Sequence, residues 1–307
     1  MRTSVRGASA VTFAVGVLLL AAACASSPQA PNAGLTTPPT ATSTSPPSST
    51  SGTPTVTNSV TTATTPTTTT SAPSAPAPAP KPTPHASTRA PTAPIQASLV
   101  GRVVSRIPTS RRVVALTFDA GANGDGVNSI LATIARERVA ATFFLTGDFV
   151  NSFPPLAVRM SAAGRLGNHT ASHPHLPTLT DAQVMTQVTS TRATFLRITG
   201  EDPRPLFRFP FGDSGPRDLR MVNDLGYVAV GWTVDTLGWQ GTSGGRSVDS
   251  VVQRVLAAAT PGEIVLMHVG SHPTDHSTLD ADSLPRVIAG LRAAGYSFVT
   301  LDALGAR

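Results

Sequence analysis

Short apolar runs alternate with longer amphipathic segments from residue 98 onward. The apolar runs predict strands at Val113–Phe118, Val139–Leu145, Arg165–Asn168, Leu206–Phe209, Tyr227–Val234, Glu263–Met267 and Phe298–Leu301. The segments between them predict helices at 126–137, 148–163, 181–199, 215–225, 247–259 and 280–295. Continuous apolar strands that alternate with helices are typical of a parallel sheet covered by helices. The pattern therefore predicts an α/β fold, a distorted (β/α) barrel of about seven parallel strands.

Residues 25–97 lack this periodicity. Of these 73 residues, 60 are Ala, Ser, Thr or Pro, and none is acidic. Such a segment cannot bury enough apolar surface to offset the entropy of ordering it. We therefore expect a disordered linker at 25–97, followed by one domain at 98–307 whose core spans about 110–305.

The first 24 residues have the features of an export signal. Arg2 and Arg6 precede an uncharged apolar run at 8–23, which is shorter than the roughly 20 residues of a membrane-spanning helix. The run leads into Cys24, the single cysteine of the chain, in a segment that resembles a bacterial lipoprotein cleavage site. We expect Cys24 to carry a lipid that anchors the protein to the outer face of the cell membrane, from which the linker reaches into the cell wall. An ordinary secretory signal is the alternative.

The distribution of charge excludes one class of partner. The net charge of +6 falls to +2 from residue 98 onward, where 19 arginines stand against 17 acidic residues. Binding of nucleic acid needs cations massed on one face, whereas these arginines are scattered among acidic residues. We expect no nucleic-acid partner, and we expect the protein to be a monomer.

Polar side chains follow five of the predicted strands. They are Asp119, the pair His169 and His173, Arg208, Asp235 and His268. The carboxyl ends of the strands of a parallel β/α barrel open on one face, where active sites lie, so we expect these side chains to meet there. The two histidines, four residues apart, predict a shared divalent metal on one side of a helical turn. Asp119 is a candidate general base or metal ligand.

A second motif offers an alternative chemistry. Gly241-Thr-Ser243-Gly-Gly245 matches the G-x-S-x-G pattern of serine hydrolases, and Asp275 and His276 follow it. A nucleophile elbow places its serine directly between a strand and a helix, whereas Ser243 lies in a long predicted loop. A flexible glycine loop explains the motif better, and a Ser243 esterase is kept as an alternative.

Together these segments resemble the polysaccharide deacetylase family, carbohydrate esterase family 4, over about residues 110–305. The motifs follow the order of the family: T-F-D ending at Asp119, H-T-x-x-H from His169, R-x-P-F-G from Arg208, D-x-x-x-W from Asp235 and L-x-H ending at His268. The resemblance implies a distorted barrel with fewer strands than the eightfold form. It also implies a metal-dependent hydrolase.

The resemblance assigns a role to each catalytic candidate. Asp119 would be the catalytic base, oriented by Arg208. His268 would be the general acid, tuned by Asp235. The backbone N–H near Phe211 would help to bind the oxyanion.

The resemblance makes His169 and His173 ligands of a divalent metal, for which we expect zinc. Family members commonly have a second aspartate directly after the base as a third ligand, and this chain has Ala120 there. Asn123 or Asp125 could fold back to fill the gap, and water is the alternative. Asp125 is therefore included among the expected ligands.

The expected reaction is the release of acetate from a cell-envelope glycan, either peptidoglycan or another N-acetylglucosamine polymer. Trp239 would wall the pocket, and Leu266 would line the site of the acetyl group. An O-acetyl ester is an alternative substrate. The alternative from another class is a non-catalytic wall-binding protein that has lost activity through Ala120.

Overall fold

A computed structural model describes residues 95–305. The predicted signal peptide, Cys24 and the linker up to residue 94 lie outside the described residues. No helix in residues 95–305 is long and apolar enough to cross a membrane.

Nine strands form one sheet in the described part of the chain. They are β1 (Val103–Val104), β2 (Val113–Ala120), β3 (Ala141–Leu145), β4 (Arg165–Asn168), β5 (Leu206–Phe207), β6 (Val228–Val230), β7 (Val234–Asp235), β8 (Glu263–His268) and β9 (Ser297–Phe298). The order is β1-β6-β5-β4-β3-β2-β8-β7, with β9 paired to β2, and every strand pair is parallel. The predicted distorted (β/α) barrel is confirmed.

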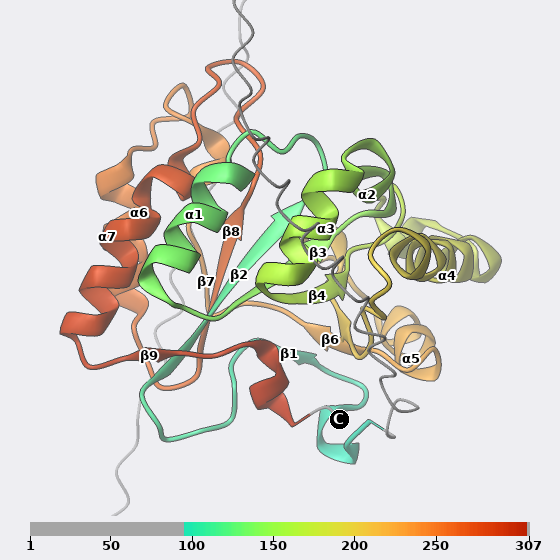
Figure 1. Ribbon diagram of the computed structural model, residues 1–307. Coiled ribbons are helices and arrows are strands. Elements are labelled where there is room, and N and C mark those ends of the chain that lie inside the picture. Colours follow the sequence, from blue (N-terminus) through green and yellow to red (C-terminus); the bar gives the residue numbers. More distant parts are fainter. Residues whose placement is uncertain (1–94, 306–307) are drawn as a thin grey trace, which may run out of the picture. The chain divides into compact units, whose positions relative to one another are not determined.

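Seven α-helices lie around this sheet in the same part of the chain. They are α1 (Val127–Glu137), α2 (Gly147–Ser152), α3 (Pro154–Ala163), α4 (Asp181–Ile198), α5 (Pro216–Asp224), α6 (Val248–Ala258) and α7 (Leu279–Ala293). Figure 1 shows β2 and β8 near the centre, with α1, α6 and α7 on one side and α4 and α5 on the other. All eight residues of β2 are buried, and this strand pairs with β3, β8 and β9.

Two predicted elements are divided in the structure. The prediction of a single strand at Tyr227–Val234 is wrong, because the structure has two strands there. β6 pairs with β1 and β5, whereas β7 pairs with β8. Gly231 lies at the break, where a Cβ atom would come within 2.8 Å of the Ser105 hydroxyl.

The helix expected at 148–163 is broken at Phe153, which precedes Pro154 and has φ −129° and ψ 56°. A residue before proline is disfavoured in the helical region, which explains this break.

Glu263, at the start of β8, is a carboxylic acid buried without a partner. Its side chain is 0% exposed, and neither carboxylate oxygen has a hydrogen-bond partner. Burial raises the pKa of Glu263 to about 7, from 4.5 for an exposed side chain. The folded protein therefore keeps this proton over a pH range in which the unfolded chain has lost it. Stability should then fall as pH rises from 4.5 to 7.

The variant Glu263→Gln tests this account. We expect the parent to lose roughly 2–3 kcal/mol of unfolding free energy between pH 5 and pH 8 through this group. Glu263→Gln should remove that loss, because glutamine does not ionise. Urea unfolding at both pH values measures the difference, with Glu201→Gln as the matched control. An unchanged pH dependence in Glu263→Gln would contradict the account.

Candidate active site

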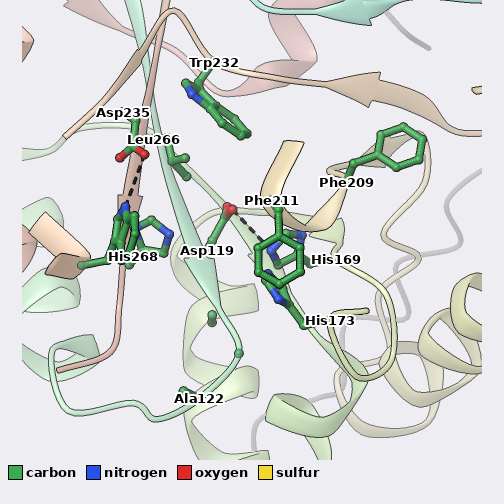
Figure 2. A pocket seen from close by; sticks show the side chains of 13 residues that line it. Asp119, Ala122, His169, His173, Phe209, Phe211, Trp232, Asp235, Leu266 and His268 are labelled. Atoms are coloured by element: carbon green, nitrogen blue, oxygen red, sulfur yellow. Dashed lines mark hydrogen bonds and ion pairs between the residues drawn. The ribbon is translucent and has the colours of Figure 1, made fainter. Parts of the chain in front are cut away.

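The carboxyl ends of the central strands bring the expected side chains, apart from the buried Arg208, to one pocket. Asp119 lies near the end of β2, His169 follows β4, Arg208 follows β5, and His268 ends β8. The pocket has a volume of about 610 Å³. Its lining is Asp119, Ala120, Gly121, Ala122, His169, His173, Phe209, Phe211, Trp232, Asp235, Trp239, Leu266 and His268. Figure 2 shows Asp119 between the pair His169 and His173 on one side and His268 on the other.

Asp119 is held by a buried arginine. Arg208 is fully buried and donates from Nη1 to Asp119 Oδ1 over 2.7 Å. Its Nη2 donates to the Gly231 carbonyl over 3.0 Å, and its guanidinium carbon lies 4.2 Å from the ring centre of Phe144. The guanidinium is thus fixed on several sides, and it orients the carboxylate of Asp119 as expected.

The histidine pair is close, but not on a helical turn. The rings of His169 and His173 are 4.7 Å apart, whereas the backbone between them forms an irregular loop with positive φ at Thr170 and His173. The expected helical turn is therefore wrong, and the expected proximity of the two rings is confirmed. The buried side chain of Asn168 helps to shape this loop by accepting the Thr170 N–H over 2.9 Å.

The surrounding charges shift the pKa values of the candidate base and the candidate acid in opposite directions. Burial acts to raise the pKa of Asp119, but Arg208 and the neighbouring histidines outweigh burial and hold that pKa below its usual value. Burial acts to lower the pKa of His268, but the carboxylates around it outweigh burial and raise that pKa above its usual value. At neutral pH this favours a carboxylate at Asp119 and an imidazolium at His268. Two titratable groups whose pKa values are pushed apart are suited to be base and acid of one reaction.

The donor chemistry of the histidine pair fits a divalent cation. His169 Nδ1 lies 2.9 Å from the Arg208 carbonyl oxygen. A carbonyl only accepts, so Nδ1 carries the proton and the Nε2 lone pair faces Asp119 Oδ2 at 3.4 Å. Burial lowers the pKa of His169, and burial together with His169 lowers the pKa of His173 to about 4. Both rings are therefore neutral at pH 7, as metal ligands must be.

The third ligand expected from the sequence is not at this pocket. Asp125 Oδ2 accepts a hydrogen bond from the Ser271 hydroxyl over 2.5 Å, and Asn123 Oδ1 accepts one from the Ser271 N–H over 2.8 Å. These bonds join the loop after β2 to the loop after β8, and neither side chain lines the pocket. Within residues 95–305, no three His, Cys, Asp or Glu side chains are arranged to hold a metal.

Two aromatic side chains stand at the mouth of the pocket. Phe211 and Trp239 are 58% and 48% exposed, which is unusual for residues of this size and typical of a binding surface. Phe211 has a left-handed backbone, with φ 59°, and its ring stacks on His175 at 4.0 Å between centroids. Leu266, on β8, and Trp232 line the interior of the same pocket. Trp232 was not foreseen, because it lies in the irregular segment between β6 and β7.

The contacts of Asp235 and His268 differ from the expected pairing. Asp235 accepts hydrogen bonds from the Leu237 N–H over 2.8 Å and from the Trp239 ring nitrogen over 3.3 Å. The dashed line at Asp235 in Figure 2 is its bond with Trp239. The carboxylate nearest to His268 belongs to Asp280, whose Oδ2 lies 3.6 Å from His268 Nδ1. No sequence motif marks Asp280, because it lies one residue inside α7 and after a polar loop.

The serine motif does not form a catalytic triad. Ser243 Oγ lies 3.4 Å from His272 Nδ1, and Asp275 Oδ2 lies 3.5 Å from the same nitrogen. A Ser-His-Asp relay needs the serine and the aspartate on different ring nitrogens. The contacting histidine is also His272 and not the expected His276. These residues instead tie the Gly241–Gly245 segment to the loop before α7.

Comparisons with known proteins point to a single family. The profile of the family described as polysaccharide deacetylase matches residues 106–230. A peptidoglycan-N-acetylglucosamine deacetylase of Bacillus cereus is 33% identical over 198 residues, which cover 64% of this chain and 70% of that protein. A crystal structure of a peptidoglycan N-acetylglucosamine deacetylase superimposes with a TM-score of 0.61 at 31% identity, covering 67% of this chain and 94% of the other.

A further solved structure is described as a pseudoenzyme of the same family from Bacillus anthracis. It has a TM-score of 0.61 and 26% identity, and the match covers 66% of this chain and 69% of that one. The fold alone therefore does not imply activity. In this chain Asp119 and His268 line one pocket, and the buried Arg208 is bonded to Asp119. The chain belongs to the polysaccharide deacetylase family, carbohydrate esterase family 4, and is an enzyme of that family.

Proposed function

We propose that this protein removes N-acetyl groups from a cell-envelope glycan, with peptidoglycan as the substrate, and releases acetate. The observation that carries the proposal is the position of Asp119, bound to Arg208 on one side of the pocket, with His268 opposite. The activity named for the Bacillus cereus relative supports peptidoglycan as the polymer. The near-neutral charge of the domain also suits a glycan better than a strongly charged polymer.

The reaction is the hydrolysis of an amide. Asp119 accepts a proton from water as the water oxygen attacks the acetyl carbon. The backbone N–H near Phe211 helps to stabilise the negative charge that develops on the carbonyl oxygen. The carbon–nitrogen bond then breaks, and His268 donates a proton to the departing amine. The products are acetate and a glycan with a free amino group.

A divalent metal, for which we expect zinc, would be held by His169 and His173. When bound, it polarises the acetyl carbonyl and lowers the pKa of water at the site. Catalytic zinc usually has three protein ligands, and Ala120 stands where a third ligand is common in the family. Water is the expected replacement, because both Asn123 and Asp125 are bonded to Ser271.

The pocket walls suit an acetylated sugar. Leu266 and the ring of Trp232 provide an apolar interior for the acetyl methyl group. The exposed rings of Phe211 and Trp239 offer apolar faces for pyranose rings at the mouth.

We also propose that the enzyme works at the outer face of the cell membrane. The support is the export signal ending at Cys24 and the Pro-rich linker, both read from the sequence. The linker would carry the catalytic domain from a lipid anchor into the cell wall. A secreted protein without a lipid would remain in the aqueous phase after detergent partition, and this result would overturn the anchor.

Metal removal tests the role of the histidine pair. We expect a chelator to abolish acetate release from peptidoglycan and added zinc to restore it. Titration calorimetry should show one zinc ion bound by the parent and by the control His276→Ala. Affinity should fall by more than about 100-fold in His173→Ala, which exceeds the usual cost of losing a second-shell partner.

Other outcomes of this experiment favour the alternatives. Acetate release that resists the chelator would contradict the metal mechanism. Release from O-acetylated but not N-acetylated substrate would indicate an esterase. Binding of peptidoglycan without release of acetate would indicate a non-catalytic wall-binding protein.

A further inference from the structure

Asp280 is a buried carboxylate behind the active-site pocket. It lies in the first turn of α7 and is 4% exposed. The N-terminal end of a helix carries partial positive charge from its free N–H groups. An acidic residue is therefore favourable at this position.

The Asp280 carboxylate contacts both the backbone and the ring of His268. Asp280 Oδ2 accepts the His268 backbone N–H over 2.8 Å and lies 3.6 Å from His268 Nδ1. Nδ1 is buried and has no hydrogen-bond partner, and Asp280 Oδ1 is also buried and without a partner. The ring nitrogen and the carboxylate are thus enclosed together. His268 also lines the pocket, so its other ring nitrogen, Nε2, is the one available to a substrate.

The surrounding backbone leaves the carboxylate little freedom. A Cβ atom on Gly238 would lie 2.3 Å from Asp280 Oδ1 and 2.6 Å from its carboxyl carbon. Only glycine at 238 therefore permits this close approach. The carboxylate is confined between the segment Gly238–Gln240, the end of β8 and the first turn of α7.

Three carboxylates face His268 from different elements: Asp119 on β2, Asp235 on β7 and Asp280 on α7. Asp119 is bonded to Arg208, and Asp235 is bonded to Leu237 and Trp239. Asp280 alone of the three lies within an ion-pair distance of a His268 ring nitrogen. The contacts of Asp235 instead fix the loop that carries Trp239 at the mouth.

We propose that Asp280 is the positioning residue of the general acid, which it orients and keeps protonated through Nδ1 of His268. This inference rests on the proposed deacetylase reaction. The carboxylate holds a proton on Nδ1 and stabilises the imidazolium, so that the proton on Nε2 is the one transferred to the departing amine. After transfer the neutral ring keeps its Nδ1 proton toward Asp280. Its Nε2 regains a proton from the solvent, and Asp119 releases to the solvent the proton that it took from the attacking water. Asp235 instead holds the loop that carries Trp239 at the mouth of the pocket.

Titration of His268 in the full-length protein without substrate tests this proposal directly. NMR of histidine-labelled protein follows the ring, which is assigned by its absence in His268→Gln. We expect Asp280→Asn to lower the pKa of His268 by about one unit or more, and Asp235→Asn to lower it less. Asp282→Asn, on the exposed side of the same helical turn, should leave the titration unchanged.

The pH profile of acetate release gives a second reading. In Asp280→Asn the alkaline limb of kcat/KM should move to lower pH by the same amount as the pKa. At pH 8 kcat should fall by about 10-fold or more, because less of the acid is protonated. The Asp282→Asn profile should match that of the parent.

Gly238→Ala keeps the proposal testable if Asp280→Asn does not fold. The added methyl group displaces the carboxylate without removing its charge, and it should also lower the pKa of His268. An unchanged His268 titration in the folded variants, or a larger fall in Asp235→Asn than in Asp280→Asn, would overturn the proposal. The titration needs no substrate, so its result is independent of the deacetylase assay. A failure of the deacetylase assay alone would contradict the proposed function and leave the role of Asp280 intact.

Discussion

Replacing Asp119 with asparagine should lower kcat/KM for acetate release by at least about 10³-fold. Asparagine cannot accept the proton of the attacking water, and general-base catalysis typically contributes 10²–10⁴-fold. Asparagine keeps the size of the side chain and an oxygen that can accept from Arg208. Binding of substrate should therefore change much less than kcat. Release of acetate at saturating and subsaturating substrate separates the two effects.

The matched control is Asp224→Asn. Asp224 is an exposed residue at the end of α5, and its replacement should leave the rate unchanged. Thermal unfolding of both variants shows whether they remain folded at the temperature of the assay. Folded Asp119→Asn protein with more than about a tenth of the parent rate would contradict the role of Asp119 as base, since that loss is below the usual range.

Replacing Arg208 with methionine should reduce the unfolding free energy by about 3–5 kcal/mol. The guanidinium is fully buried and bonds both Asp119 and the Gly231 carbonyl. Methionine fills much of the space between Phe144 and Trp232 but leaves the carboxylate of Asp119 buried without its cation. The loss is thus the cost of an uncompensated charge more than of packing. Urea unfolding at pH 7 measures it.

Arg286→Met is the control for this experiment. The side chains of Arg286 and its partner Asp249 are 57% and 71% exposed. An exposed pair contributes about 0–1 kcal/mol, so the control should unfold close to the parent. An equal loss of unfolding free energy in the two variants would contradict the account, because it would show that the buried Asp119–Arg208 pair contributes no more to stability than an exposed pair. Arg208→Met should also lose deacetylase activity, because Asp119 is no longer oriented.

The sequence was sufficient to predict the fold class and most of the pocket. Parallel strands separated by helices have only one face on which their carboxyl ends meet. Polar residues that directly follow such strands, such as Asp119, Arg208 and His268, are therefore brought together by topology alone. No knowledge of side-chain conformation was needed for that step.

Features that depend on irregular backbone could not be predicted. The loop from His169 to His173 follows positive φ angles that no periodic pattern encodes. The division of Tyr227–Val234 into two strands depends on which neighbours are free to pair, and apolar character along the chain does not reveal this. For the same reason the sequence did not indicate that Trp232 lines the pocket.

Partners that come from distant helices were also hidden. Asp280 approaches His268 only because α7 folds back over the end of β8, and Gly238 leaves room for its carboxylate. In the sequence Asp280 looks like any acidic residue in the first turn of a helix. Conversely, Asp125 looked like a metal ligand because it is close to Asp119 in sequence. Its bond to Ser271 places it in a loop contact instead.

We propose that the cluster around Asp119 hydrolyses N-acetyl amides of a cell-wall glycan. The most direct test measures acetate and new free amino groups together, in purified peptidoglycan treated with the parent or with Asp119→Asn protein. The parent should release equal molar amounts of acetate and amine, and the variant almost none. Acetate without new amino groups, equal release by the two proteins, or no release by the parent would contradict this proposal.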